Sequence, residues 1–99
     1  MSEIKDNDKN LSDLFETFTK FENAEEAKLF FEDLCTPVDL IAMAARWRVV
    51  KEIKKNKSYR QIHADTGVSL TTISRIARCI TYGTGGYNII YDRINKEEL

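Results

Sequence analysis

Hydrophobic residues in the first third of the chain recur at the spacing of an α-helix. Leu11, Leu14, Phe15 and Phe18 stand at positions i, i+3, i+4 and i+7, which fall on one face of a helix. Residues 1–10 are polar and acidic and carry no such pattern, so we expect a flexible N-terminal segment there. The first helix is therefore predicted to begin at about Leu11.

A second helix is predicted by the same spacing further along. Ala27, Phe30, Phe31 and Leu34 again occupy positions i, i+3, i+4 and i+7. Asn23 precedes them and belongs to the residue types preferred as helix N-caps. Two glutamates follow it in the first turn, where carboxylates interact favourably with the helix dipole.

A third helix is predicted to start at Pro37, since Thr36 offers a capping hydroxyl and proline is well tolerated at a first helical position. It runs to about Lys55. Its apolar residues are Val38, Leu40, Ile41, Met43, Ala44, Ala45, Trp47, Val49, Val50 and Ile53. They are too many for one narrow stripe, so the helix must be covered on several sides. The apolar surface of this helix and the aromatic faces of the first two helices are therefore predicted to be buried against a second copy of the chain. The alternative is a monomer that packs all of them internally.

The strongest motif is the segment SYRQIHADTGVSLTTISRIARCI at residues 58–80. Ser58 and Gln61 have the spacing of a capping box at the start of one short helix. Gly67 then supplies a turn in which a positive φ costs little, and Val68 packs beneath it. Two capped helices joined by a tight glycine-containing turn are typical of a helix-turn-helix.

The second helix of this motif has two different faces. Ser69 is its predicted N-cap, and Ile73, Ile76 and Ile80 form the inner face. The opposite face is left for DNA, with hydroxyls near the helix start and arginines further along. Candidate DNA-contacting residues in this helix are Ser69, Leu70, Thr71, Thr72, Ser74, Arg75 and Arg78. The sequence leaves open which of them contact bases and which contact phosphates.

Basic residues before and within the motif are further candidates. Lys57 and Arg60, with Lys54 and Lys55, could contact phosphates, or could be ordinary solvated charges. Position 63, four before the turn glycine, is commonly small where the two helices cross, but here it is His63. The two helices could therefore cross in a displaced arrangement, with His63 partly buried in a packing role. The alternative for the motif as a whole is a pair of helices of the same shape that contacts protein instead of DNA.

The end of the chain predicts a connector and a last helix. Residues 83–86 include three glycines, and Tyr87, Ile90, Tyr91 and Ile94 then return to the helical spacing. The strand-favouring residues in YNIIY leave a strand as the alternative. The GTGG stretch lacks the spacing and the lysine of a phosphate-binding loop, so we expect a connector there.

Charge is unevenly distributed behind a net charge of −1. Residues 1–39 hold 4 Lys and Arg against 11 Asp and Glu, whereas residues 40–82 hold 9 against 2. A polyanion is therefore expected to meet the middle of the chain. The carboxylates cluster in the first third, and the only histidine lies inside the helix-turn-helix, so no acid, base and nucleophile are predicted to converge and an enzyme is not expected.

Composition predicts one small folded protein. Apolar residues make up 42% of 99 residues, and only four glycines and one proline interrupt them. No run approaches the roughly 20 apolar residues of a membrane span, so we expect a cytoplasmic protein. Cys35 and Cys79 lack metal-site spacing and are expected to be buried reduced thiols, and neither a metal nor a cofactor is expected.

The predicted fold class is all-α, with a single domain over 1–99. Within it we expect the flexible segment, then dimerisation and core helices over 11–55, the helix-turn-helix over 58–80, and the connector and last helix over 83–99.

The motifs RWRVV, SYRQI, TGVSLTTISRI and YGTGGYNIIYDRI, between Phe30 and Ile94, resemble the YerC/YecD family of Trp-repressor-like proteins. The resemblance implies an intertwined, all-helical homodimer that presents two helix-turn-helix units to double-stranded DNA. A pseudo-palindromic operator then matches the two-fold symmetry of the protein. A dimeric protein-interaction module that keeps the fold without binding an operator is the alternative.

The resemblance also concerns a ligand site. Arg46 and Arg75 match the two arginines that hold the corepressor in Trp repressor. However, Ile76 replaces a glycine beside the indole, and Cys79 replaces the serine that binds the ligand's amino group. A branched side chain would occupy the indole space, so we expect no tryptophan site, and either no effector or an unidentified small ligand.

Overall fold

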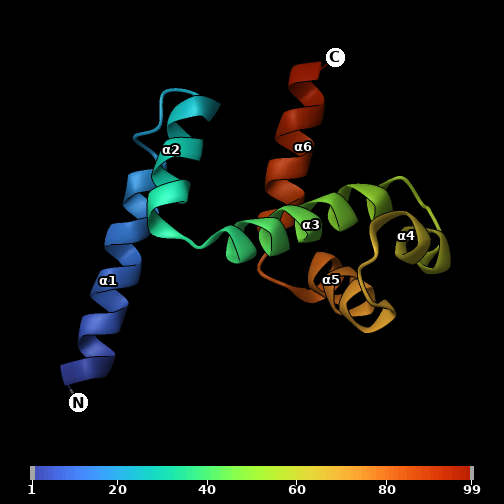
Figure 1. Cartoon of the computed structure of the whole chain (residues 1–99), viewed down its shortest axis with the longest axis horizontal. Helices are drawn as coiled ribbons and strands as arrows, with labels where there is room; N and C mark the ends of the chain where they lie inside the picture. The colour runs from blue at the N-terminus through green and yellow to red at the C-terminus, as the bar shows by residue number, and fades with distance from the viewer. Residues whose placement is uncertain (1, 99) are drawn as a thin grey trace. The chain divides into compact units, whose positions relative to one another are not determined.

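The computed structural model describes residues 2–98, and all its regular structure is helical (Figure 1). The helices are α1 (Ser2–Phe18), α2 (Ala24–Leu34), α3 (Pro37–Lys54), α4 (Tyr59–Thr66), α5 (Leu70–Tyr82) and α6 (Gly86–Glu98). No strand occurs within residues 2–98. The predicted all-α class is thus confirmed, and the segment YNIIY lies in a helix.

One expectation about the first part of the chain differs from the structure. Helix α1 begins at Ser2, so the described part of the segment 1–10 is helical rather than irregular. It contains neither glycine nor proline, and a helix can continue through polar residues that form no apolar stripe. The described chain divides into two compact units, one ending at Leu40 and the other beginning at Ile41.

The N-terminal unit is organised around phenylalanines. The rings of Phe18, Phe21, Phe30 and Phe31 lie with neighbouring centroids 5.3–6.1 Å apart, within the range of favourable aromatic pairs. As predicted, Asn23 caps α2, because its side-chain oxygen accepts a hydrogen bond of 2.9 Å from the Glu26 backbone N–H. No residue of α2 is fully buried.

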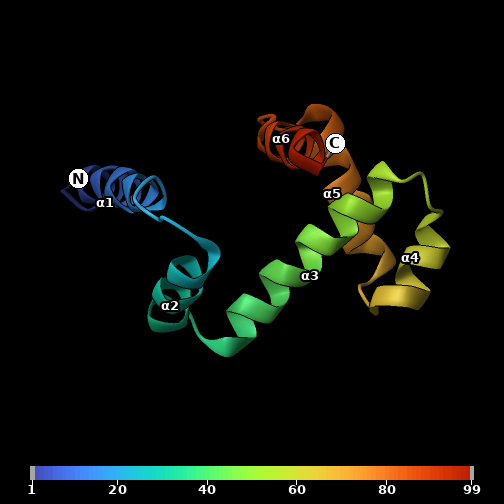
Figure 2. The ribbon, with the colours of Figure 1, turned by 90° about the horizontal axis from the view of Figure 1, so that it is seen from above.

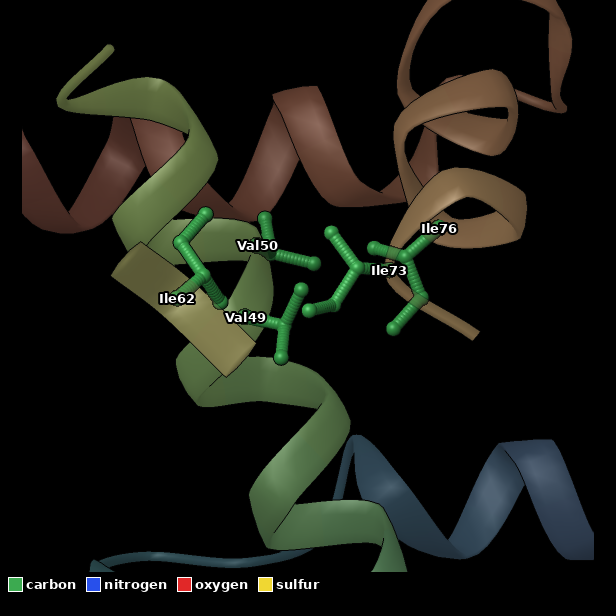
Figure 3. Close-up of a cluster of buried hydrophobic side chains, with 5 residues drawn as sticks. All are labelled: Val49, Val50, Ile62, Ile73 and Ile76. Atoms are coloured by element: carbon green, nitrogen blue, oxygen red, sulfur yellow. The ribbon is translucent and has the colours of Figure 1, made fainter. Parts of the chain in front are cut away.

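The C-terminal unit has a small closed core. Val49 and Val50 of α3, Ile62 of α4, and Ile73 and Ile76 of α5 point toward one another in Figure 3. The first four are 0% exposed and Ile76 is 4% exposed. Figures 1 and 2 show α4 and α5 packed beside the C-terminal half of α3. This core fixes the inner side of the predicted helix-turn-helix, and so determines which side chains face outward.

Short polar contacts set the ends of these helices. Ser58 and Ser69 accept hydrogen bonds of 3.1 Å from the backbone N–H groups three residues later, as predicted for N-caps. The capping box at α4 is only half formed, because the Gln61 amide donates to Asp65 instead of returning to Ser58. Gly67 ends α4 with φ +77°, a left-handed conformation that glycine adopts at little cost.

Candidate nucleic-acid interface

The outer face of α5 carries most of the residues predicted to contact DNA. Leu70, Thr71, Ser74, Arg75 and Arg78 are all exposed, while Ile73 and Ile76 of the same helix lie in the core. Arg60, in the first turn of α4, is exposed as well. The structure therefore gathers these candidates on the surface of one helical pair, with two arginines and two hydroxyls on the second helix.

Ser69 and Thr72 have local roles at the start of α5. The Ser69 hydroxyl accepts a hydrogen bond from the Thr72 backbone N–H at 3.1 Å and donates to Thr72 Oγ1 at 3.0 Å. Thr72 is half-buried. The Ser69 hydroxyl is thus already used in capping, so Thr71 and Ser74 offer the hydroxyls better placed to meet a ligand.

His63 is exposed, which corrects the expectation of a partly buried histidine. Its Nδ1 lies 2.7 Å from the Val68 carbonyl oxygen, so an N–H at that position donates across the turn. The ring therefore holds the turn together from outside instead of lying where the helices cross. This explains how the motif accommodates a large residue at this position, because Ile62 fills the crossing with 0% exposure.

Lys57 has a structural environment that its sequence position did not suggest. Its ammonium lies 2.8 Å from a carboxylate oxygen of Glu52 and 3.7 Å from one of Asp65, and Arg48 lies 3.8 Å from the other Glu52 oxygen. Glu52 is only 8% exposed. Lys57 thus links Glu52 of α3 to Asp65 of α4, and a DNA phosphate would have to compete with these two carboxylates for it.

This ion pair shifts both titrating groups. The hydrogen bond from Lys57 lowers the pKa of Glu52 below its ordinary value of 4.5, although burial opposes the shift. The hydrogen bond to Glu52 raises the pKa of Lys57 above its ordinary value of 10.5. The ion pair therefore stabilises the fold at pH values between the pKa of Glu52 and the pKa of Lys57, where both groups are charged.

The substitution Lys57→Met is expected to lower the melting temperature at neutral pH, because it leaves the Glu52 carboxylate buried without its main partner. A group with a lowered pKa contributes stability that is lost as the pH falls through its folded pKa. The difference from wild type should therefore shrink as the pH falls below 4.5. Thermal unfolding across this range measures it, with Lys51→Met, an exposed lysine on α3, as the control. A difference that stays constant with pH would contradict this role of the ion pair.

The two arginines that match the corepressor site do not form a ready pocket. Arg75 lines an open hollow with Arg78, Cys79, Tyr82 and Gly83, and Arg46 is not among the lining residues. Ile76, at the position of the missing glycine, is only 4% exposed and belongs to the core. Cys79 is exposed and Cys35 is half-buried, so the expectation of two buried thiols is wrong.

Two aromatic residues near the interface were missed from the sequence. Tyr82 closes α5, and the Arg78 guanidinium carbon lies 5.6 Å from its ring centroid. Tyr59, the first residue of α4, lines a second hollow beside α5. The spacing of four residues between Arg78 and Tyr82 was the available signal, because side chains so spaced are neighbours on a helix.

Known proteins resemble this chain over most of its length. The family model described as Trp repressor protein matches residues 9–95. The uncharacterized protein YerC of Bacillus subtilis (strain 168) is 36% identical over 90 residues, covering 91% of this chain and 86% of YerC. A TrpR-like protein from Eubacterium eligens ATCC 27750 superposes with a TM-score of 0.83 at 32% identity, covering 88% of this chain and 90% of that one. A proposed Trp repressor from Staphylococcus aureus superposes with a TM-score of 0.82 at 38% identity, covering 87% and 86%.

The fold and these matches place the chain among helix-turn-helix regulatory proteins. The chain belongs to the Trp repressor family and resembles its YerC-like members, which confirms the resemblance seen in the sequence motifs. Proteins of this family are regulators and not enzymes, in agreement with the absence of convergent catalytic groups predicted from the sequence. Among the residues that the structure describes, no helix has both the length and the apolar character to cross a membrane.

Proposed function

We propose that the protein is a sequence-specific DNA-binding transcriptional regulator, acting as a repressor in the cytoplasm, that reads a pseudo-palindromic operator through α4 and α5. The observation that carries this proposal is the division of α5 into a buried face and an outward face bearing Thr71, Ser74, Arg75 and Arg78. Exposed hydroxyls at the start of such a helix and arginines behind them suit entry into a major groove.

Charge supports the choice of DNA as partner. The helix-turn-helix lies in the segment 40–82, where basic residues outnumber acidic ones by 9 to 2. Neutralising phosphates with such residues releases counterions and gives affinity that falls steeply with salt. A protein-interaction module of the same fold would bind through apolar surface and depend much less on salt, so salt dependence separates the two functions.

A homodimer is part of the same proposal. Large apolar side chains remain exposed over α1, α2 and the first turns of α3. They are Leu11, Phe15, Phe18, Leu29, Leu34, Val38, Ile41 and Met43. Exposed apolar side chains in this number indicate interaction surfaces in a folded protein. A second copy of the chain, as the family resemblance implies, would cover these side chains. It would also supply a second helix-turn-helix for the other half of the operator.

We further propose that tryptophan is not the effector. Ile76 follows Arg75 directly on α5, and its side chain fills space inside the core. An indole ring would have to displace this side chain from a packed cluster, which costs more free energy than displacing a flexible side chain at the surface. An operator-binding form that needs no tryptophan is therefore the simpler expectation.

The test is selection from a pool of random duplex DNA followed by sequencing, at two salt concentrations. Wild type is expected to enrich a pseudo-palindrome, and the Arg75→Ala, Arg78→Ala double variant is expected to lose that enrichment. Circular dichroism of the variant checks that it still folds. An absence of both enrichment and salt-dependent binding in wild type would overturn the proposed function.

A further inference from the structure

The two arginines on the outer face of α5 have different surroundings. Arg78 lies over the ring of Tyr82 at 5.6 Å, within the distance of a cation–π contact. This contact draws its guanidinium toward the C-terminal end of α5. Within residues 6–96, Arg75 forms no ion pair or aromatic contact, and it stands nearly one helical turn closer to the start of the helix. The two side chains are therefore suited to different tasks.

Arg78 also borders a hollow that Arg75 does not line. This hollow has a volume of about 340 Å³ and lies between the start of α4 and the middle of α5. Its apolar lining residues are Ile53, Ala77 and Ile80, and its polar lining residues are Tyr59, Ser74, Arg78, Thr81 and Tyr82. The lining thus combines one guanidinium with four hydroxyl groups and no carboxylate.

Such a lining suits a phosphodiester of a DNA backbone. The guanidinium can bind two phosphate oxygens, and hydroxyls such as those of Tyr59 and Ser74 can donate further hydrogen bonds. The apolar residues offer a surface on which a deoxyribose can pack. In helix-turn-helix complexes, the N-terminal residues of the second helix meet base edges, while the first helix crosses the backbone. Tyr59 is the first residue of that first helix, so the hollow lies where a strand would pass.

We propose that Arg78 binds a backbone phosphate of the DNA in this hollow, held in position by Tyr82, and that Arg75 is the arginine that reads base edges. This division of roles rests on the proposed DNA binding and goes beyond it, because it separates a residue that gives affinity from one that gives specificity. Tyr82 is a positioning residue that acts through Arg78.

The test compares Arg78→Ala with Arg75→Ala on the selected operator and on a scrambled duplex, between about 50 and 200 mM salt. Arg78→Ala should weaken binding to both duplexes by the same factor. It should also make the slope of log affinity against log salt shallower by about 0.9 for each subunit. Arg75→Ala should weaken operator binding by about 5- to 150-fold and scrambled DNA much less. Circular dichroism shows whether each variant is folded.

Two further measurements identify the partner of Arg78. Duplexes carrying one uncharged methylphosphonate at successive positions should reveal a phosphate whose neutralisation weakens wild type but not Arg78→Ala. Tyr82→Leu should weaken binding about 2- to 5-fold on both duplexes but add nothing to Arg78→Ala. Tyr82→Phe keeps the ring and should restore most of the affinity that Tyr82→Leu loses.

The outcomes separate this inference from the proposed function. Wild-type protein without salt-dependent DNA binding would overturn both. If wild type selects an operator, but Arg78→Ala changes the preferred bases or leaves the salt slope intact, the proposed function stands and the assignment of Arg78 to the backbone is wrong.

Discussion

Replacing Ile73 with alanine is expected to lower the free energy of unfolding by about 2–5 kcal/mol. Ile73 is 0% exposed and packs among the other members of the core, Val49, Val50, Ile62 and Ile76. Removing its outer atoms loses their transfer free energy and leaves a cavity that so small a core can fill only in part. Since small domains are stable by about 5–15 kcal/mol, the change removes a large fraction of the total.

Urea denaturation followed by circular dichroism measures this loss, at one fixed protein concentration. Leu70→Ala is the matched control, because Leu70 stands on the same helix but is 51% exposed on the outer face. It should change stability by less than about 1 kcal/mol. DNA affinity should show the opposite order. While both variants are folded, Leu70→Ala should weaken DNA binding more than Ile73→Ala, because Leu70 lies on the proposed contact face. Equal losses of stability in both variants would contradict the inner and outer faces assigned to α5.

These faces of α5 were predictable from sequence because they depend on local rules. Ser58 and Ser69 cap their helices through atoms three residues away, and Gly67 takes its left-handed conformation within one turn. The isoleucine spacing alone then determines which side of the helix is inward. The helix over the described part of residues 1–10 was missed because it has no apolar stripe, and the side chains of residues 6–10 are exposed.

Contacts across turns could not be predicted in the same way. Lys57 reaches back to Glu52 only because the chain reverses after α3, where Asn56 takes a φ of +63°. Nothing in the spacing of charges distinguishes this lysine from its neighbours Lys54 and Lys55. His63 likewise finds the Val68 carbonyl only once the turn is formed. The basic segment was therefore recognised as a whole, while the roles of its members required three-dimensional geometry.

The double substitution Val38→Asp, Ile41→Asp is expected to convert the protein from a dimer to a monomer. Val38 and Ile41 are 74% and 70% exposed, and their spacing places them on one face of α3. If a second copy covers them, each buried side chain contributes roughly 1.5–3 kcal/mol, and a dimer buries four of them. Even half of the smallest sum corresponds to a loss of dimer affinity of more than about a hundredfold. The new carboxylates oppose association further, because burying an unpaired charge is costly.

Light scattering after size exclusion measures this change directly. Wild type should have twice the chain mass of 11.5 kDa, and the double variant should have that mass alone. Asn10→Asp adds a carboxylate at an exposed polar position and should remain dimeric. The monomer should also bind the operator more weakly than wild type, because one subunit reaches one half-site and loses the gain from linking two. A wild-type mass of one chain would contradict the dimer, and the exposed apolar side chains of α1, α2 and early α3 would then need a different partner.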